Sequence, residues 1–241
     1  LGTVSLAHLT CVGSDKESID EALRIYKEKN ISNILALRGD LPEGVSKLDD
    51  DCDFLHASDL AAYIKEKGDF CIGGDCYPEK HPESPDTEKD ILYLREKAEA
   101  GCDFLTTQMF FDNNTLYNFL YRIREAGIEV PVLPGIMPIT NKKQVARSVA
   151  LSGATIPQRF RTVVDRFGDD PGKMKQAGVI YATEQIVDLI ANGVNHIHVY
   201  SMNTEEAHYD DDYFSDPPYD LPNVVLYSKI AQHTFYRYQD L

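Results

Sequence analysis

The sequence predicts an α/β fold in which parallel β-strands alternate with crossover helices. Its 241 residues, 43% of them apolar, are enough to bury a sizeable core. Apolar runs are followed by turn residues and an amphipathic segment six times, with a repeat of roughly 30 residues, as in βα units. This alternation is compatible with an open doubly wound sheet and with a closed (β/α)8 barrel.

Strands are predicted where β-branched and large apolar residues gather in short runs. In chain order they cover residues 3–9, 33–37, 70–74, 103–108, 130–136 and 196–200. Helices are predicted at residues 15–29, 57–67, 86–100, 113–126, 141–151 and 173–192. Ser14 and Asp15 are N-cap candidates for the first of these helices, and Pro85, Asp86 and Thr87 are predicted to open the third. A further short helix is expected within 156–170, where Phe160, Val163, Val164 and Phe167 have helical spacing.

Six units are two fewer than an eight-stranded barrel contains. Because residue 1 already lies at the edge of a strand, we expect two βα units to precede it and residues 1–207 to form a partial barrel. Neither G-x-G-x-x-G nor G-x-x-x-x-G-K-[ST] occurs, so no phosphate-loop motif supports the open sheet. Residues 208–241, which are acidic, aromatic and proline-rich, are predicted to form an extended arm or a disordered tail.

Charge and cysteine content narrow the possible partners. The formal net charge of −15 argues against electrostatic binding of nucleic acid or anionic lipid. No apolar run reaches the roughly 18 residues of a membrane span. The five cysteines lack C-x-x-C spacing, which indicates reduced thiols in a cytoplasmic protein rather than disulfides or a metal site. We therefore expect small-molecule ligands and a cytoplasmic location.

Polar residues cluster where the predicted strands end, which is where the chemistry of a parallel barrel lies. They include His8, Arg38, Asp40, Asp75, Tyr77, His81 and Gln108, together with the turn-forming Gly39. Taken singly each has a simpler explanation, such as an ion-paired turn at Arg38 and Asp40. His196 and His198 have the spacing of metal ligands in some barrel hydrolases, but histidines that are buried or hydrogen-bonded are the default interpretation.

Helix 86–100 presents a second candidate surface. Asp90, Tyr93 and Lys97 share one side of it, beside an apolar stripe. This is either an ordinary amphipathic helix or a polar side that faces a cofactor. In the second case Lys97 would be available to a phosphate and Asp90 to a ribose hydroxyl.

Five motifs together resemble the methylenetetrahydrofolate reductase family in its bacterial-type catalytic domain. They are HLTC at 8–11, ALRGDLP at 36–42, YPEKHPE at 77–83, AGCDFLTTQMFFD at 100–112 and PVLPGIMPITN at 131–141. The resemblance runs from His8 to about Asn203. It implies a (β/α)8 barrel that binds FAD without a Rossmann motif. It also implies reduction of 5,10-methylenetetrahydrofolate to 5-methyltetrahydrofolate with NADH or NADPH in a ping-pong cycle.

The resemblance also implies roles for particular residues. The flavin contacts would be His8, Arg38, Gly39, Asp40, Ala57, Tyr77, His81, Ser84, Asp90, Tyr93 and Lys97. Asp40 and Gln108 would be the catalytic residues, and both would touch the folate together with Gln144. Gln108 would serve folate and nicotinamide in turn, and Asp40 would stabilise the positive charge that develops on the folate. A homo-oligomer is expected, since family members are usually dimers or tetramers.

One family feature has no counterpart in the given sequence. The general acid of the family is a glutamate on the first barrel strand, and the sequence begins after that strand, which we interpret as truncation. Glu79 and Glu83 lie on the same rim, but nothing assigns them the role. Two other hypotheses stay open. One is a non-catalytic folate- or flavin-binding homologue or partner subunit, and the other is an unrelated barrel lyase or metal-dependent hydrolase that uses His8, Asp40 and His81.

Overall fold

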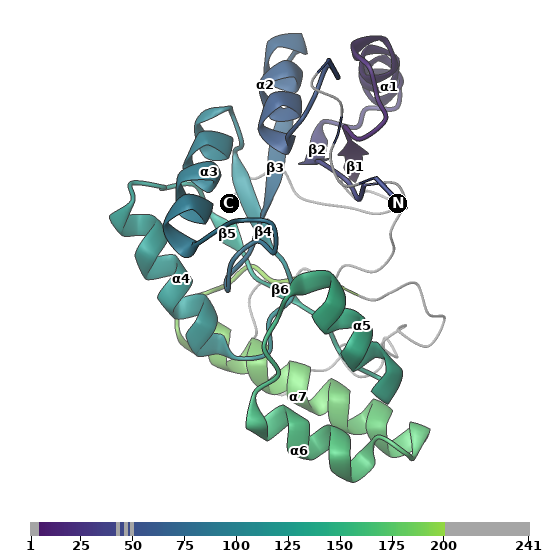
Figure 1. Cartoon of the computed structure of the whole chain (residues 1–241), viewed down its shortest axis with the longest axis vertical. Coiled ribbons are helices and arrows are strands. Elements are labelled where there is room, and N and C mark those ends of the chain that lie inside the picture. Colours follow the sequence, from purple (N-terminus) through teal and green to yellow (C-terminus); the bar gives the residue numbers. More distant parts are fainter. Residues whose placement is uncertain (1–4, 42–43, 46–47, 49–50, 201–241) are drawn as a thin grey trace.

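A computed structural model describes residues 5–41, 44–45, 48 and 51–200. These residues form a five-stranded parallel sheet, a two-stranded parallel sheet and the helices around them (Figure 1). The strands are β1 Leu6–Thr10, β2 Asn33–Leu37, β3 Cys71–Cys76, β4 Phe104–Thr107, β5 Val132–Leu133, β6 Gly135–Ile136 and β7 His198–Val199. The helices are α1 Lys16–Glu28, α2 Ala57–Lys67, α3 Thr87–Glu99, α4 Asn113–Glu125, α5 Lys142–Ser152, α6 Gln158–Phe167 and α7 Pro171–Ala191.

The helices begin where the sequence predicts capping residues. The Asp15 carboxylate accepts a hydrogen bond from the Ser18 backbone N–H at 2.8 Å, and Asp86 accepts one from the Lys89 N–H at the same distance. The expected extra helix is α6, whose Phe160 and Val164 are buried. The predictions of an α/β class with parallel strands and of these helices are therefore confirmed.

The predicted strand 130–136 is wrong as a single element. It divides into β5 and β6 at Pro134, because a proline has no N–H to continue a ladder of hydrogen bonds. β5 pairs with β4, whereas β6 pairs with β7. The Pro134 carbonyl instead accepts a hydrogen bond from the His198 N–H at 2.8 Å, so the break is where the chain passes from one sheet to the other.

The five strands of the larger sheet follow one another in chain order, β1-β2-β3-β4-β5. A doubly wound sheet would reverse its order at a switch point, and this sheet has no such reversal. The order is that of a barrel wall, and closure into an eight-stranded barrel stays a prediction. The predicted arm 208–241 lies outside the described residues.

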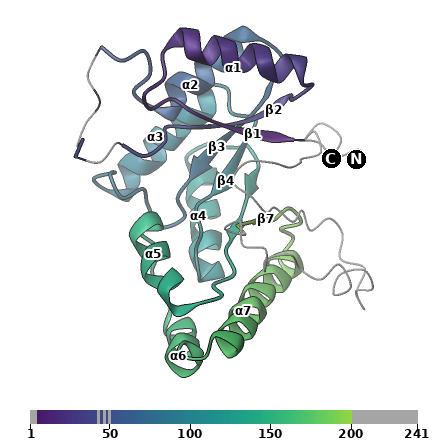
Figure 2. The same ribbon diagram turned by 90° about the vertical axis from the view of Figure 1, so that its right-hand side faces the viewer.

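One face of the sheets packs against the helices. Helices α1 and α2 bury Ile19, Leu23, Leu60 and Ile64 in one cluster with Ile34 of β2 and Ile72 of β3. Helices α3, α4 and α7 bury Leu94, Leu116 and Leu189 with Leu105 of β4 and Val199 of β7. Figures 1 and 2 show α6 and α7 together at the end of the molecule away from α1. The apolar core thus lies between the strands and the helices.

The opposite face of the sheet carries the alternate residues of each strand. Neighbouring positions in the register place Leu6, Cys71, Phe104 and Leu133 there, and these form a small apolar cluster. Further along the same face lie His8 of β1, Asp75 of β3 and Thr106 of β4. The face is therefore apolar toward the N-terminal ends of the strands and polar toward their C-terminal ends.

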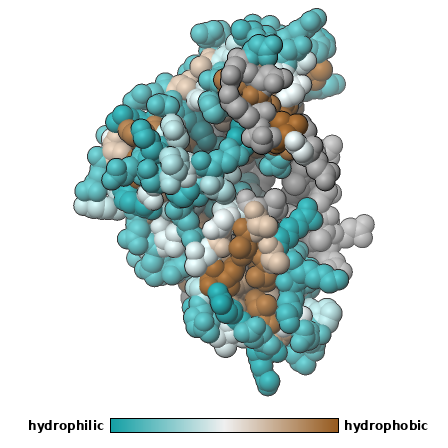
Figure 3. All heavy atoms as spheres, in the orientation of Figure 1, coloured by the Kyte–Doolittle hydropathy of each residue, from teal (hydrophilic) through white to brown (hydrophobic). Residues whose placement is uncertain are grey.

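The outer surface is largely hydrophilic on the side drawn in Figure 3, with apolar side chains gathered around α5 in the lower half of the view. On α5, Ala146 and Ala150 are exposed. Within the described ranges, no helix is both long and apolar enough to cross a lipid bilayer.

Candidate functional site

Three predicted site residues occupy equivalent places on neighbouring strands. Arg38, Tyr77 and Gln108 are each the first residue after the end of β2, β3 and β4. These strands are hydrogen-bonded neighbours and run parallel, so their ends meet at one edge of the sheet. This arrangement forms a polar rim, which we define as these three residues together with the polar side chains of the strands, loops and helices that lie at the same edge of the sheet.

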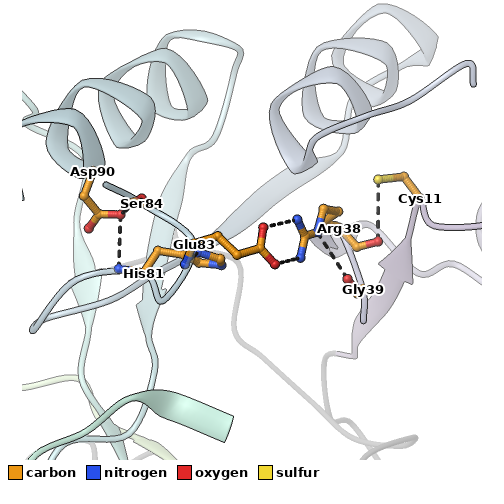
Figure 4. Close-up of polar contacts among 7 residues, drawn as sticks. All are labelled: Cys11, Arg38, Gly39, His81, Glu83, Ser84 and Asp90. Carbon is orange, nitrogen blue, oxygen red and sulfur yellow. Dashed lines mark hydrogen bonds and ion pairs between the residues drawn. The ribbon is translucent and has the colours of Figure 1, made fainter. Parts of the chain in front are cut away.

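Arg38 connects the end of β2 to the loop between β3 and α3 (Figure 4). Its two terminal nitrogens donate to the two carboxylate oxygens of Glu83 at 2.6 and 2.7 Å. This bidentate geometry is the strongest that an arginine makes with a carboxylate. The hydrogen bonds from Arg38 hold the pKa of Glu83 below its usual value, so both groups are charged at neutral pH.

His81, Ser84 and Asp90 form the next part of the rim. The Asp90 carboxylate accepts hydrogen bonds from the Ser84 hydroxyl at 2.7 Å and from the His81 backbone N–H at 3.2 Å. The His81 Nδ1 accepts from the Glu83 N–H at 3.1 Å, which places any single ring proton on Nε2. Burial lowers the pKa of His81. The imidazole is therefore neutral at pH 7.

Lys97 reaches the end of β3 from α3. Its ammonium group donates to the Asp75 carboxylate at 2.5 Å and to the Asp75 carbonyl at 2.8 Å. Burial opposes the charge on both side chains, but their mutual attraction outweighs it. As a result the pKa of Asp75 is lowered and that of Lys97 is raised, and the two form an ion pair.

Tyr77 and Gln108 lie between these charged pairs. The Tyr77 ring packs edge-on against the His81 ring, with centroids 4.5 Å apart. Burial, with the Asp75 carboxylate adding to it, raises the pKa of Tyr77 to about 12, against the effect of a hydrogen bond with Gln108. The Gln108 Oε1 also accepts the Met109 N–H at 2.9 Å, which orients the amide. Tyr77 is thus a neutral phenol at pH 7.

Two predicted contacts lie on the rim without joining this network. His8 is exposed on β1, on the same face of the sheet as Asp75. Asp40 is also exposed, two residues beyond Arg38. It follows Gly39, whose φ of 89° favours glycine and where a Cβ would lie 3.2 Å from the Thr10 Cβ. The turn therefore brings the chain close to β1 and turns Asp40 to solvent.

The other predicted residues have positions that also explain them structurally. Ala57 is the buried first residue of α2, and Tyr93 is exposed on α3. The Gln144 Oε1 accepts the N–H groups of Thr140 at 2.8 Å and Asn141 at 3.2 Å, completing a capping box at the start of α5. Their assigned contacts with flavin or folate stay predictions.

The family resemblance assigns no role to Asp75 or Thr106, although both lie at the rim. Asp75 precedes Tyr77 by two residues and therefore shares its face of the strand, a signal present in the sequence. Thr106 is its register partner on β4 and is 2% exposed. Within the part of the chain that the structure describes, the Thr106 Oγ1 makes no hydrogen bond. The Thr106 hydroxyl is therefore a buried polar group without a hydrogen-bond partner among the described residues.

All five cysteines are free thiols. Within residues 5–200, apart from the short gaps between 42 and 50, no three His, Cys, Asp or Glu side chains are placed to hold a metal ion.

Comparison with known proteins identifies the family. The family model described as methylenetetrahydrofolate reductase matches residues 1–210. Methylenetetrahydrofolate reductase 2 of Saccharomyces cerevisiae is 40% identical over 213 residues, covering 86% of this chain and 36% of the yeast protein. The 5,10-methylenetetrahydrofolate reductase of Pectobacterium carotovorum is 35% identical over 208 residues, covering 86% of this chain and 68% of the bacterial protein.

Solved structures are more distantly similar to this chain, and one of them serves as an example. It is an uncharacterized protein from Clostridium thermocellum that binds two copies of 5-methyl-5,6,7,8-tetrahydrofolic acid. Its TM-score is 0.45 and its sequence is 13% identical, and the match covers 81% of this chain and 86% of that one.

The chain spans about a third of the length of the yeast relative and about two thirds of that of the bacterial relative. On the family match and these identities, the chain belongs to the methylenetetrahydrofolate reductase family.

Proposed function

We propose that the chain reduces 5,10-methylenetetrahydrofolate to 5-methyltetrahydrofolate with NADH or NADPH, using bound FAD in a ping-pong cycle. Membership of the reductase family supports folate one-carbon reduction. The main structural support is the convergence of Arg38, Tyr77 and Gln108 from three neighbouring strands on one rim. Residues that are 39 and 31 positions apart meet there because parallel strands end together.

Several groups on the rim suit a flavin dinucleotide and support this proposal. Arg38 and Lys97 are cations for phosphate oxygens, and the side chains of Tyr77 and His81 offer an aromatic surface. The buried Thr106 hydroxyl, which makes no hydrogen bond within the described residues, is a ready partner for a polar ring atom. When bound, FAD would supply the relay of hydride from the nicotinamide to the folate.

Gln108 and Asp40 would act on the substrates. The Gln108 Oε1 is held by the Met109 N–H, which directs the amide NH2 as a donor toward either ligand. Opening the methylene bridge of the folate produces a cationic iminium. The exposed Asp40 carboxylate at the end of β2 would stabilise that positive charge beside the rim. A homo-oligomer and a cytoplasmic location stay predictions.

The experiment that tests this function measures the two half-reactions separately. The full chain is purified, mixed with FAD and examined for the visible absorption of a bound flavin. Under anaerobic conditions NADH or NADPH should bleach that absorption, and 5,10-methylenetetrahydrofolate should restore it. Bound flavin that neither nicotinamide reduces would instead support a non-catalytic flavin-binding homologue. Absence of any bound flavin would contradict the proposal.

The variant Asp40→Asn tests the assigned carboxylate. It should keep its flavin and its oxidation of NAD(P)H, while the folate half-reaction slows by roughly tenfold or more, because the charge beside the iminium is lost. Asp51→Asn, which removes an exposed carboxylate from the loop before α2, is the matched control and should behave as wild type. Equal loss in both half-reactions of Asp40→Asn would contradict the role of Asp40.

A further inference from the structure

The positive charge of the Lys97 ammonium group on the rim is already balanced by the carboxylate of Asp75. Two of its three N–H donors are directed to Asp75, one to the carboxylate at 2.5 Å and one to the carbonyl at 2.8 Å. The pair is mostly shielded, since the side chains of Lys97 and Asp75 are 19% and 29% exposed. In such surroundings a carboxylate interacts with a cation more strongly than it would in water.

The backbone of β3 allows this pair to form. A Cβ on Gly74 would lie 3.0 Å from the Lys97 Cδ, so the glycine leaves the space through which the lysine side chain passes. At the next residue, Asp75, both the carbonyl and the carboxylate face the ammonium group. Lys97 is thereby directed to the end of β3 with one donor left over, while its charge is balanced.

We propose that Asp75 weakens the hold of this site on the cofactor phosphate by competing with it for Lys97. The inference rests on the proposed function, in which Lys97 contacts the flavin phosphate. A phosphate oxygen that approaches Lys97 meets the Asp75 carboxylate, which repels it and occupies one of the three N–H donors. Removing the Asp75 charge leaves a shielded cation without its counter-charge, and a phosphate then becomes its best partner.

A purely structural role for Asp75 makes a different prediction. If the pair only attached α3 to β3, its loss would loosen the whole site and weaken all flavins alike. Competition for Lys97 concerns only ligands that carry phosphate. FAD and riboflavin share the isoalloxazine ring but only FAD has phosphate, so comparing them separates the two roles.

The test measures the dissociation constants of FAD and riboflavin by flavin fluorescence with the full chain. Asp75→Asn should bind FAD about tenfold more tightly than wild type and riboflavin within about threefold of it, because only the phosphate contact changes. The double variant Asp75→Asn with Lys97→Met should lose the gain for FAD. The control is Asp20→Asn on α1, which removes a carboxylate that pairs with Lys67 of α2 at 2.8 Å. This variant should leave both dissociation constants unchanged.

Each outcome supports or overturns the competition between Asp75 and the phosphate for Lys97. Unchanged or weaker FAD binding by Asp75→Asn, or a gain that persists in the double variant, would overturn the competition. If Asp75→Asn unfolds at the assay temperature, FAD but not riboflavin should restore its thermal transition, and failure of that rescue would also overturn it. Wild-type protein that binds neither flavin would contradict the proposed function itself, which distinguishes the two failures.

Discussion

At the scale of single residues, two glutamates of the rim, Glu79 and Glu83, are already engaged in hydrogen bonds. Glu83 accepts both terminal nitrogens of Arg38, and its pKa lies below the usual value. Glu79 accepts the Thr155 N–H at 2.7 Å and the Thr155 hydroxyl at 2.5 Å. A general acid needs a raised pKa so that it still holds its proton at neutral pH. Glu83 has the opposite shift, so it is not suited to protonate the folate.

Gln108 is the rim residue whose amide should matter in both half-reactions. In Gln108→Glu the donor NH2 becomes a carboxylate oxygen, which removes the hydrogen bond and adds a negative charge. We expect both the oxidation of NAD(P)H and the reduction of folate to fall by roughly tenfold or more in anaerobic stopped-flow measurements. The control is Gln176→Glu on the exposed side of α7. A Gln108→Glu enzyme with normal rates would remove this residue from the site.

At the scale of elements, α7 is held in place by a close approach of two backbones. The middle of the helix, at Gly178, lies against the backbone of Ile139, which precedes α5. A Cβ on Gly178 would lie 1.8 Å from the Ile139 carbonyl oxygen. A second contact holds α7 close by, because the Tyr181 hydroxyl donates a hydrogen bond to the Phe111 carbonyl at 2.7 Å. This approach fixes α7 beside β6 and the loop that leads to α5.

Gly178→Ala should therefore destabilise the protein. The added methyl group meets backbone rather than a movable side chain, so we expect a loss of about 3 kcal/mol in the free energy of unfolding. Gly172→Ala in the same helix is the control. There the new Cβ would meet only the Asp170 carboxylate at 3.6 Å, and the change should stay within about 1 kcal/mol. Urea unfolding followed by circular dichroism measures both, and equal stabilities would contradict the close approach.

At the scale of the whole molecule, a histidine on the first described strand affects the pKa of a histidine on the last one. His198 of β7 is 6% exposed, and its ring lies 4.5 Å from that of Tyr200. Burial, with the charge of His8 on β1 adding to it, lowers the pKa of His198 from 6.5 to about 4. The charge of His8 thus acts on His198 although β1 and β7 belong to different sheets.

The lowered pKa of His198 makes stability depend on pH. As the pH falls below 6.5 the unfolded chain takes up a proton that the folded chain accepts only near pH 4. The stabilisation present above pH 6.5 is therefore lost as the pH falls to about 4, with a loss of about 2 kcal/mol between pH 7 and pH 5. Urea unfolding at several pH values should show a flatter dependence in His198→Gln. Parallel curves for the two proteins would contradict this assignment.

Much of the fold could be predicted because its signals are local. The caps Asp15 and Asp86 and the helical spacing of Phe160 and Val164 each depend on residues within a few positions. The apolar run 130–136 predicts one strand, but Pro134 lies within it. Because Pro134 has no N–H, the ladder of hydrogen bonds ends there and the run divides into β5 and β6. The rim positions of Arg38, Tyr77 and Gln108 also followed from the sequence, since parallel strands place their ends together.

The sequence by itself thus determined the α/β class, the helices, the family and the edge of the sheet at which polar residues meet. Only the tertiary structure decided which charge meets which: Arg38 with Glu83, and Lys97 with Asp75. It also decided the transfer of the chain from one sheet to the other at Pro134. The physical reason is the distance along the sequence over which each kind of interaction acts. Periodicity and capping act over a few residues, whereas an ion pair depends on distances of a few ångström between side chains 22 or 45 positions apart.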